Sequence, residues 1–337
     1  MARGSRIALG ATASRIALGA TAIALLAPAP AAVADGPVVP NLTFGGSGVT
    51  DADGSVRYVT LPGAAGSTTV VKIDAAAGSV LVQRVVPGRW GVTMVSADGV
   101  TDGLSGDGRT LVLAEFPRGD GPRRAHTRFL VLGTERLSPR ATIRVPGWDG
   151  LDAVSADGRL LYLIQARPQN LLDYRVRAYD LAARRLLPEP VVDPREPGEK
   201  MQGYSLARVW SDDRTTAYTL YSEGTDKGFI HALHTDSRSA DCIDLPAWVM
   251  GRNPAGIDLA ADGTLVVLKP AGARIATIDP VTREVSPWRE PATAPEEPPA
   301  REGGNGLPVL PALAVIGVIG LALIGAAVTV RRRPTAG

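Results

Sequence analysis

Groups that usually carry catalysis or bind metals are scarce in this chain of 337 residues. It has one cysteine, Cys242, and three histidines, His126, His231 and His234. A lone cysteine excludes an internal disulfide, so the fold has to rest on its apolar core, and we expect Cys242 to be a small, half-buried strand residue. Residues three apart on a strand point to opposite faces, so His231 and His234 cannot easily share a metal ion, and we expect both to be solvated. The sequence therefore predicts no catalytic residue, no metal site and no cofactor.

Acidic residues are absent from both ends of the chain. All 34 acids lie within residues 35–306, while six of the 36 basic residues stand in the two ends. The middle of the chain therefore has 30 basic against 34 acidic residues, a net charge of −4. A slightly acidic domain lacks the positive surface that binds phosphate backbones, which excludes nucleic acid as a partner.

The N-terminal end has the pattern of a secretory signal peptide. Three arginines accompany an apolar run, IALGATAIALLA (16–27), and the small residues Ala32 and Ala34 follow as a cleavage site. We expect residues 1–34 to be removed, so that the mature chain begins at Asp35.

The C-terminal end has the pattern of a membrane anchor. Residues 312–330 are nineteen residues without a charge, which as a helix can cross a bilayer. Three arginines follow at 331–333, and the positive-inside rule places the tail, 331–337, in the cytoplasm. The Pro-, Glu- and Gly-rich residues 290–306 predict an extended stalk. We predict a single-pass protein of the cell membrane, anchored through 307–330, with its large N-terminal domain outside the cytoplasm.

The domain between these ends, residues 35–289, contains a repeat. Five segments place an aspartate in a polar turn before an apolar run: DADGSVRYVTL (51–61), SGDGRTLVLAE (105–115), SADGRLLYLIQ (155–165), SDDRTTAYTLY (211–221) and AADGTLVVLKP (260–270). An Asp-Gly turn before such a run predicts a hairpin, because glycine accepts positive φ and aspartate bonds its own backbone. The aspartates are therefore predicted to form turns rather than to bind calcium. The fourth copy has Arg214 in place of glycine, so we expect its turn to differ in type.

A second acidic residue follows each copy after a further strand. These residues are Asp74, Asp180, Asp236 and Asp279, with Glu135 in the second unit. Each unit thus indicates four antiparallel strands, and successive units are 49 to 56 residues apart. Four-stranded units in tandem predict an all-β fold, a single β-propeller of about five and at most six blades.

The motif S-x-D-G-R-x-L-Y at 155–162, followed by a strand ending in Tyr-Asp-Leu at 179–181, resembles the bacterial YVTN/WD40-like propeller repeats. The resemblance covers about residues 45–290 and implies the propeller fold. Such propellers include lactonases, cofactor-binding enzymes and interaction scaffolds, so the resemblance leaves the function open.

Tryptophans mark the ends of the repeat units. Four of the five follow a proline there: Trp90, Trp148, Trp248 and Trp288. In a propeller the loops between successive blades share one face, where flat side chains can stack on a ligand. These four are the candidate ligand-binding residues. The other interpretation is that each packs between adjacent blades and seals the junction.

We therefore predict a membrane-anchored extracytoplasmic binding or scaffold module for a protein or carbohydrate ligand. The alternative is a lactonase-like enzyme with its active site in the central channel. The scarcity of histidine and the lack of an acid–base constellation favour binding, whereas polar groups converging at the channel mouth would favour catalysis.

Overall fold

The computed structural model describes residues 42–43, 48–116, 125–167, 170–198 and 201–290. The predicted signal peptide, membrane span and tail lie outside these residues, as does the predicted stalk beyond Glu290. The chain divides into two units, 1–289 and 290–337. Within the described ranges no helix has the length and hydropathy to cross a membrane.

The described residues of the first unit form antiparallel β-structure, in five sheets that follow one another along the chain. We call these sheets blades 1 to 5. Blade 1 contains β2 (Val49–Thr50), β3 (Val56–Pro62), β4 (Ser67–Asp74) and β5 (Val80–Pro87). Blade 2 contains β6 (Trp90–Met94), β8 (Thr110–Glu115), β9 (His126–Gly133) and β10 (Ser138–Pro146). Blade 3 contains β11 (Asp149–Val154), β12 (Leu160–Arg167), β13 (Asn170–Asp180) and β14 (Arg185–Val191).

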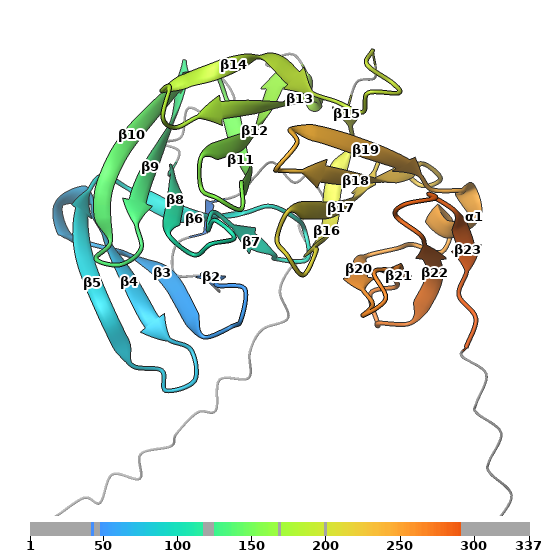
Figure 1. Ribbon diagram of the computed structural model, residues 1–337, viewed down its shortest axis with the longest axis horizontal. Helices are drawn as coiled ribbons and strands as arrows, with labels where there is room; N and C mark the ends of the chain where they lie inside the picture. Colours follow the sequence, from blue (N-terminus) through green and yellow to red (C-terminus); the bar gives the residue numbers. More distant parts are fainter. Residues whose placement is uncertain (1–41, 44–47, 117–124, 168–169, 199–200, 291–337) are drawn as a thin grey trace, which may run out of the picture. The chain divides into compact units, whose positions relative to one another are not determined.

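The last two blades follow the same order. Blade 4 contains β16 (Tyr204–Trp210), β17 (Thr216–Ser222), β18 (Gly228–His234) and β19 (Ser239–Asp244). Blade 5 contains β20 (Gly256–Leu259), β21 (Leu265–Leu268), β22 (Arg274–Ile278) and β23 (Val285–Pro287). Figure 1 shows the first strand of each blade toward the centre and the fourth at the periphery. This is a β-propeller-like fold, as the repeat predicts.

Short elements complete the described structure. The strands β1 (Leu42–Thr43) and β7 (Thr101–Asp102) both pair with β6, and β15 (Met201–Gln202) pairs with β13. A 3-10 turn, η1 (Ala64–Gly66), joins β3 to β4, and a single helical turn, α1 (Ala247–Met250), leads into blade 5.

The apolar core lies between neighbouring blades rather than within one. Buried clusters join blade 1 to blade 2 through Val70 and Leu113, and blade 2 to blade 3 through Phe129 and Leu163. Further clusters join blade 3 to blade 4 and blade 4 to blade 5. Since a strand in such a sheet is covered on both sides, its sequence is an apolar run rather than a strict alternation. Among the described residues no buried cluster joins blade 5 to blade 1.

The first turn of each blade, between its first and second strands, forms as the sequence predicts. In all five blades the marker aspartate accepts a 3.0 Å hydrogen bond from the backbone N–H two residues ahead; these residues are Asp53, Asp107, Asp157, Asp213 and Asp262. The expectation that the fourth turn differs is wrong. Arg214 adopts φ 59°, close to the 68° of Gly158 in blade 3. The aspartate and serine hydrogen bonds impose the left-handed conformation, and the Arg214 guanidinium lies over the Trp210 ring at 4.9 Å.

In the second turn, between the third and fourth strands, two of the predicted marker residues do not stand at the start of the turn. Asp74, Asp180 and Asp279 each accept two backbone N–H bonds at the start of the turn. In blade 4, however, the residue at this place is His234, and Asp236 lies two residues further along. In blade 2 the place belongs to Gly133, and Glu135 again lies two residues further. The fifth residue of the turn has positive φ in every blade, and outside blade 1 it is not glycine: Leu137, Arg184, Arg238 and Arg283.

Blade 2 contains an inserted hairpin that the sequence interpretation missed. Residues 96–99, Ser-Ala-Asp-Gly, form a sixth turn of the first-turn type, in which Asp98 accepts bonds from the Ser96 hydroxyl and the Val100 N–H. This turn reverses the chain so that β7 pairs back onto β6. The signal was present, since residues 96–99 are identical to residues 155–158.

Candidate functional site

The inserted hairpin connects blade 2 to blade 4 across the centre of the fold. The N–H groups of Ala97 and Asp98 donate to the carbonyls of Ser205 and Leu206 at 3.1 and 3.0 Å. The Ser205 hydroxyl donates to the carbonyl of Val95 at 2.8 Å. Two blades that are not neighbours in sequence are thereby held together by backbone as well as side-chain bonds.

A buried cluster of charges lies beside this connection. Arg208 of β16 forms ion pairs with Asp152 of β11 and with Asp102 of β7, the latter at 3.5 Å, and none of the three side chains is more than 1% exposed. The Arg208 Nε also donates to Thr219 at 2.9 Å. Trp210 Nε1 donates to Oδ2 of Asp102 at 3.1 Å, the same oxygen that faces Arg208. Blades 3 and 4 and the hairpin inserted in blade 2 therefore meet at one guanidinium.

The electrostatics of this cluster suit a structural clamp. Burial raises the pKa of Asp102, and the nearby guanidinium of Arg208 only partly offsets this effect. Burial also works against the charge on Arg208, but the carboxylates of Asp152 and Asp102 outweigh it and raise the pKa of Arg208. Such a network is costly to break, because removing the cation leaves two buried carboxylates without a counter-charge.

The first turns close the centre on one face. Gly106 of blade 2 lies so near its neighbours that a Cβ there would be 3.0 Å from the Cβ of Arg214 and 3.1 Å from the Cα of Ala156. The N–H of Asp107 donates to the carbonyl of Ala156 at 2.8 Å. Turns from blades 2, 3 and 4 are thus in direct contact.

The prediction that His231 and His234 are both solvated is wrong for His231. His231 is only 1% exposed, in contact with Cys242 Sγ at 3.9 Å and edge-on to Tyr221. Burial lowers the pKa of His231 to about 4, so the imidazole is neutral near pH 7. His234 is half-buried and bonds Asp241 at 3.0 Å and Thr216 at 3.0 Å. The sequence underestimated the burial of His231 because a polar residue on an alternating strand resembles a solvated one. Cys242 is a half-buried residue of β19, as predicted.

A cavity lined by charged side chains is located between blades 3 and 4. Its volume is about 440 Å³, within the range of small-ligand sites. The lining residues are Ser155, Ala156, Asp157, Arg159, Leu160, Asp180, Leu187, Thr235, Asp236 and Arg238. They come from the first and second turns of blade 3, from β14, and from the second turn of blade 4.

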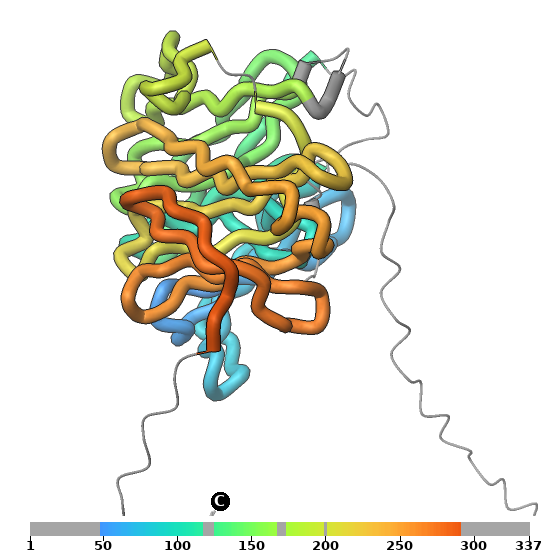
Figure 2. The backbone as a smooth tube through the Cα atoms, turned by 90° about the vertical axis from the view of Figure 1, so that its right-hand side faces the viewer, coloured from blue at the N-terminus to red at the C-terminus, as the bar shows by residue number. Residues whose placement is uncertain are grey.

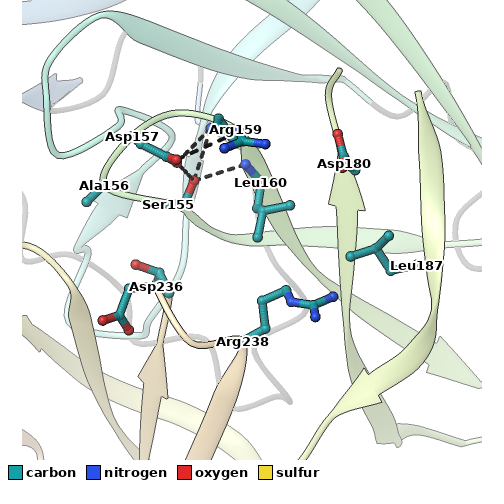
Figure 3. Close-up of a pocket in the computed structure, with 10 residues that line it drawn as sticks. Ser155, Ala156, Asp157, Arg159, Leu160, Asp180, Leu187, Asp236 and Arg238 are labelled. Carbon is teal, nitrogen blue, oxygen red and sulfur yellow. Dashed lines mark hydrogen bonds and ion pairs between the residues drawn. The ribbon is translucent and has the colours of Figure 1, made fainter. Parts of the chain in front are cut away.

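Two arginines line this cavity from different blades, Arg159 from blade 3 and Arg238 from blade 4, and Figure 3 shows them at opposite edges of the group of lining residues. Arg159 is held only loosely, with Nε 4.0 Å from Asp157 and most of its side chain exposed. Among the residues that the structure places, none pairs with the guanidinium of Arg238. Leu160 and Leu187 supply an apolar patch beside the charges.

Hydrogen bonds fix the conformation of the turns around the cavity. Asp157 accepts bonds from the Ser155 hydroxyl at 2.7 Å and from the Arg159 N–H at 3.0 Å. Burial opposes the ionisation of Asp157, but these hydrogen bonds outweigh it and lower its pKa. Across the junction, the buried Tyr162 hydroxyl donates to the carbonyl of Thr235 at 2.7 Å. Arg159 and Arg238 therefore belong to hydrogen-bonded turns of two neighbouring blades.

The arginines of the cavity were missed because the sequence gives only half of the signal. Arg159 belongs to the repeated first-turn motif. Arg238 stands where blade 1 has Gly78, and only the structure shows that a left-handed arginine occupies this place. The two are 79 positions apart, and nothing in the sequence pairs them.

Of the four predicted tryptophans, Trp90, Trp148 and Trp248 lie at connections between blades, and Trp288 follows β23, the last strand of blade 5. Trp90 begins β6 and is buried, with Nε1 donating to the carbonyl of Pro87 at 2.7 Å and the Arg128 guanidinium over its ring. Trp148 and Trp288 are partly exposed, and Trp248 in α1 is 36% exposed. None of the four lines the cavity between blades 3 and 4 or a second cavity of about 250 Å³ beside β13.

Metal binding has no candidate in the described ranges, where no group of three or more His, Cys, Asp and Glu side chains could hold an ion.

Comparison with known proteins finds structural similarity at low sequence identity. No family model matches the chain, and no curated protein matches it. A functionally unknown protein from Desulfotomaculum acetoxidans is similar at 17% identity with a TM-score of 0.43, over 72% of this chain and 68% of that one. A putative TolB from Agrobacterium tumefaciens is similar at 15% identity with a TM-score of 0.41, over 74% of this chain and 79% of that one. The β-propeller domain of Swd1 from Myceliophteria thermophila is similar at 12% identity with a TM-score of 0.39, over 72% of this chain and 67% of that one.

Proposed function

We propose that this chain is a membrane-anchored extracytoplasmic binding module, a five-bladed β-propeller that takes a charged segment of a protein ligand in the cavity between blades 3 and 4. The proposal rests on Arg159 and Arg238, which line one cavity from two blades. Two cations facing one space repel each other and favour an anionic group between them.

The lining of the cavity favours a peptide over a sugar. A carboxylate of the ligand would pair with the two arginines, while Asp180 and Asp236 at the rim would attract a basic group of the same ligand. Leu160 and Leu187 would cover an apolar side chain. No tryptophan lines this cavity, although sugar sites usually use aromatic stacking.

The centre of the fold is a poor candidate for a catalytic site. An active site in a central channel would need titratable groups that a substrate can reach. Asp102, Asp152 and Arg208 are buried and bonded to one another, and the inserted hairpin crosses beside them. These contacts are why we favour binding over the lactonase-like alternative.

The localisation in this proposal rests on the sequence pattern of the two ends. Residues 1–34 would direct export, and 307–330 would anchor the chain in the cell membrane, with 290–306 as the stalk. A chain truncated before residue 307 should leave the membrane fraction and be released; a truncated chain that stays in the membrane fraction would show that the anchor lies elsewhere.

The test of the binding site uses fluorescent peptides with the full-length chain in detergent micelles. One peptide set alternates glutamate with apolar residues, and a matched set has glutamine for each glutamate. We expect the glutamate set to bind more tightly and to lose affinity as salt is raised. The double variant Arg159→Gln, Arg238→Gln should weaken this binding by at least about tenfold, the loss of roughly 1.4 kcal/mol.

The matched control replaces Arg185 and Arg289 by glutamine, since both are exposed and lie outside the cavity. This control should bind as the wild type does. If both double variants bind alike, the cavity is not the site. If instead Trp248→Ala abolishes binding, the ligand contacts the tryptophan-bearing connections, and the site predicted from sequence replaces the cavity.

A further inference from the structure

Blade 1 has one face that no other blade covers with an apolar cluster. Its strands alternate, so the side chains of Tyr58, Val70 and Val86 pack against blade 2. The register then places Val59, Val71 and Val85 on the opposite face. We call this opposite side the outer face of blade 1.

The outer face is largely apolar and partly exposed, although Val71 in its middle is buried. Of the six exposed large apolar side chains in the described ranges, four belong to blade 1: Leu61 (45%), Val80 (58%), Leu81 (49%) and Val85 (65%). The strand register assigns Leu61 and Val85 to the outer face directly. A register shift between Lys72 and Ile73 puts Val80 opposite Ile73 on the same face, with Leu81 beside it. A contiguous apolar patch of this kind on a soluble domain marks an interaction surface.

Blade 5 does not offer a matching surface. Its side chains Ile257, Val267 and Ile278 pack against blade 4. The alternate positions of its strands include Asp258, Arg274, Thr277 and Ser286. A face with these residues would leave charges and hydroxyls against the valines and leucines of blade 1, which is unfavourable. Among the described residues, blade 5 therefore offers the outer face of blade 1 no complement.

The outer strand of blade 1 also lacks the features that protect an edge. The outer strand of blade 2 has Arg140 and Arg144, and that of blade 3 has Pro188, Glu189 and Pro190. Charges and prolines at these places prevent association of exposed strands. In β5 the one charge, Arg84, reaches toward blade 2, where its Nε donates to the carbonyl of Arg136 at 3.1 Å. In both views the β4–β5 hairpin also projects at the lower edge of the fold (Figures 1 and 2).

We propose that the outer face of blade 1 is the contact between two copies of this chain, packed sheet against sheet about a two-fold axis. A second copy supplies an identical apolar face, and a two-fold contact brings a patch onto itself. Of the remaining outer-face residues, Thr50, Thr69 and Gln83 are uncharged, whereas Arg57 of β3 is charged and is engaged in an interaction within the chain.

The size of the face sets the strength of the contact. Three strands of seven or eight residues, about 4.8 Å apart, give a face of roughly 15 Å by 23 Å, since β2 has only two residues. Two such faces bury on the order of 700 Å², below the roughly 1,200–2,000 Å² of stable complexes. The dimer is therefore expected to be weak and dependent on concentration.

Sedimentation velocity of the full-length chain in a mild detergent, over a wide range of protein concentration, tests this proposal. The wild type should shift from the monomer mass toward twice that mass as its concentration rises. Val85→Lys puts one charge per copy into the contact and should lower the association constant by at least about tenfold. The matched control is Val281→Lys, because Val281 is 87% exposed in a turn of blade 5.

The control variant should dimerise as the wild type does, and circular dichroism should show that all three chains are folded. A wild type that stays monomeric at every concentration overturns the proposal, whether another protein or undescribed residues of the same chain cover the face. A dimer that Val85→Lys leaves unchanged also overturns it, since the contact then lies elsewhere. Neither result bears on the cavity between blades 3 and 4.

Discussion

Blades 1 and 4 are built from the same repeat unit but differ in what covers them. Blade 4 is enclosed between blades 3 and 5, and its inner strand is also bonded to the hairpin inserted in blade 2. Blade 1 is covered by blade 2 on one face and leaves the other apolar face exposed. The turn motif is therefore sufficient to form a blade, but the neighbours decide whether a position tolerates a charge. Blade 4 accordingly contains buried Arg208 and His231, whereas blade 1 exposes Val85.

The largest effect expected from this comparison is the loss of Arg208. Arg208→Met should destabilise the chain by about 3–5 kcal/mol, because Asp102 and Asp152 would stay buried without a counter-charge. Urea unfolding followed by tryptophan fluorescence measures it. Arg185→Met, at an exposed position, should change the free energy of unfolding by less than about 0.5 kcal/mol. A cost below about 1 kcal/mol for Arg208→Met would show that the carboxylates do not depend on this guanidinium.

Two leucine substitutions compare the buried junction between blades 2 and 3 with the outer face of blade 1. Leu163 is fully buried between blades 2 and 3, while Leu81 is on the outer face of blade 1. Leu163→Ala should cost about 2–5 kcal/mol by removing packed methyl groups and leaving a cavity. Leu81→Ala should cost less than about 1 kcal/mol at concentrations where the chain is monomeric. Equal costs in the same unfolding assay would mean that the outer face is covered in solution.

A smaller effect concerns the pH dependence of stability. The pKa of His231 is lowered to about 4 in the folded chain, below its ordinary 6.5. Between these values the unfolded chain binds more protons than the folded one, so stability rises with pH across this window and falls on acidification. The shift corresponds to at most about 3 kcal/mol by pH 4.

The measurement is the free energy of unfolding at several pH values between 4 and 7. His231→Gln should flatten the dependence in this window, while the exposed-site variant His126→Gln should keep the wild-type slope. If His231→Gln keeps the full slope, the titrating group is another one.

The sequence predicted the blades well because their markers are local. An aspartate that bonds the N–H two residues ahead needs no partner outside the turn, so Asp157 and its counterparts could be identified from the sequence. The second turns were harder, because a left-handed Arg184 or Arg283 has no distinct sequence signature. The left-handed Arg214 in the first turn of blade 4 was missed for the same reason.

The candidate site was less predictable because it depends on contacts between blades. Arg159 and Arg238 meet only after blades 3 and 4 have packed. The ion pairs of Arg208 likewise join residues 56 and 106 positions apart in the chain. One part was within reach: the repeated Ser-Ala-Asp-Gly at 96–99 indicates an extra turn, and its hairpin is what brings Asp102 to the centre.

The central claim is that this inserted hairpin closes the centre of the fold, so that a ligand binds at the turns between blades rather than in a channel. Hydrogen exchange of the full-length chain, read by mass spectrometry, tests this claim most directly. Residues 95–102 and β16 should exchange far more slowly than β5, the outer strand of blade 1, because most of their N–H groups are hydrogen-bonded within the hairpin or between the hairpin and β16. Exchange of residues 95–102 as fast as that of β5 would contradict the claim, since the hairpin would then open readily and leave the centre accessible.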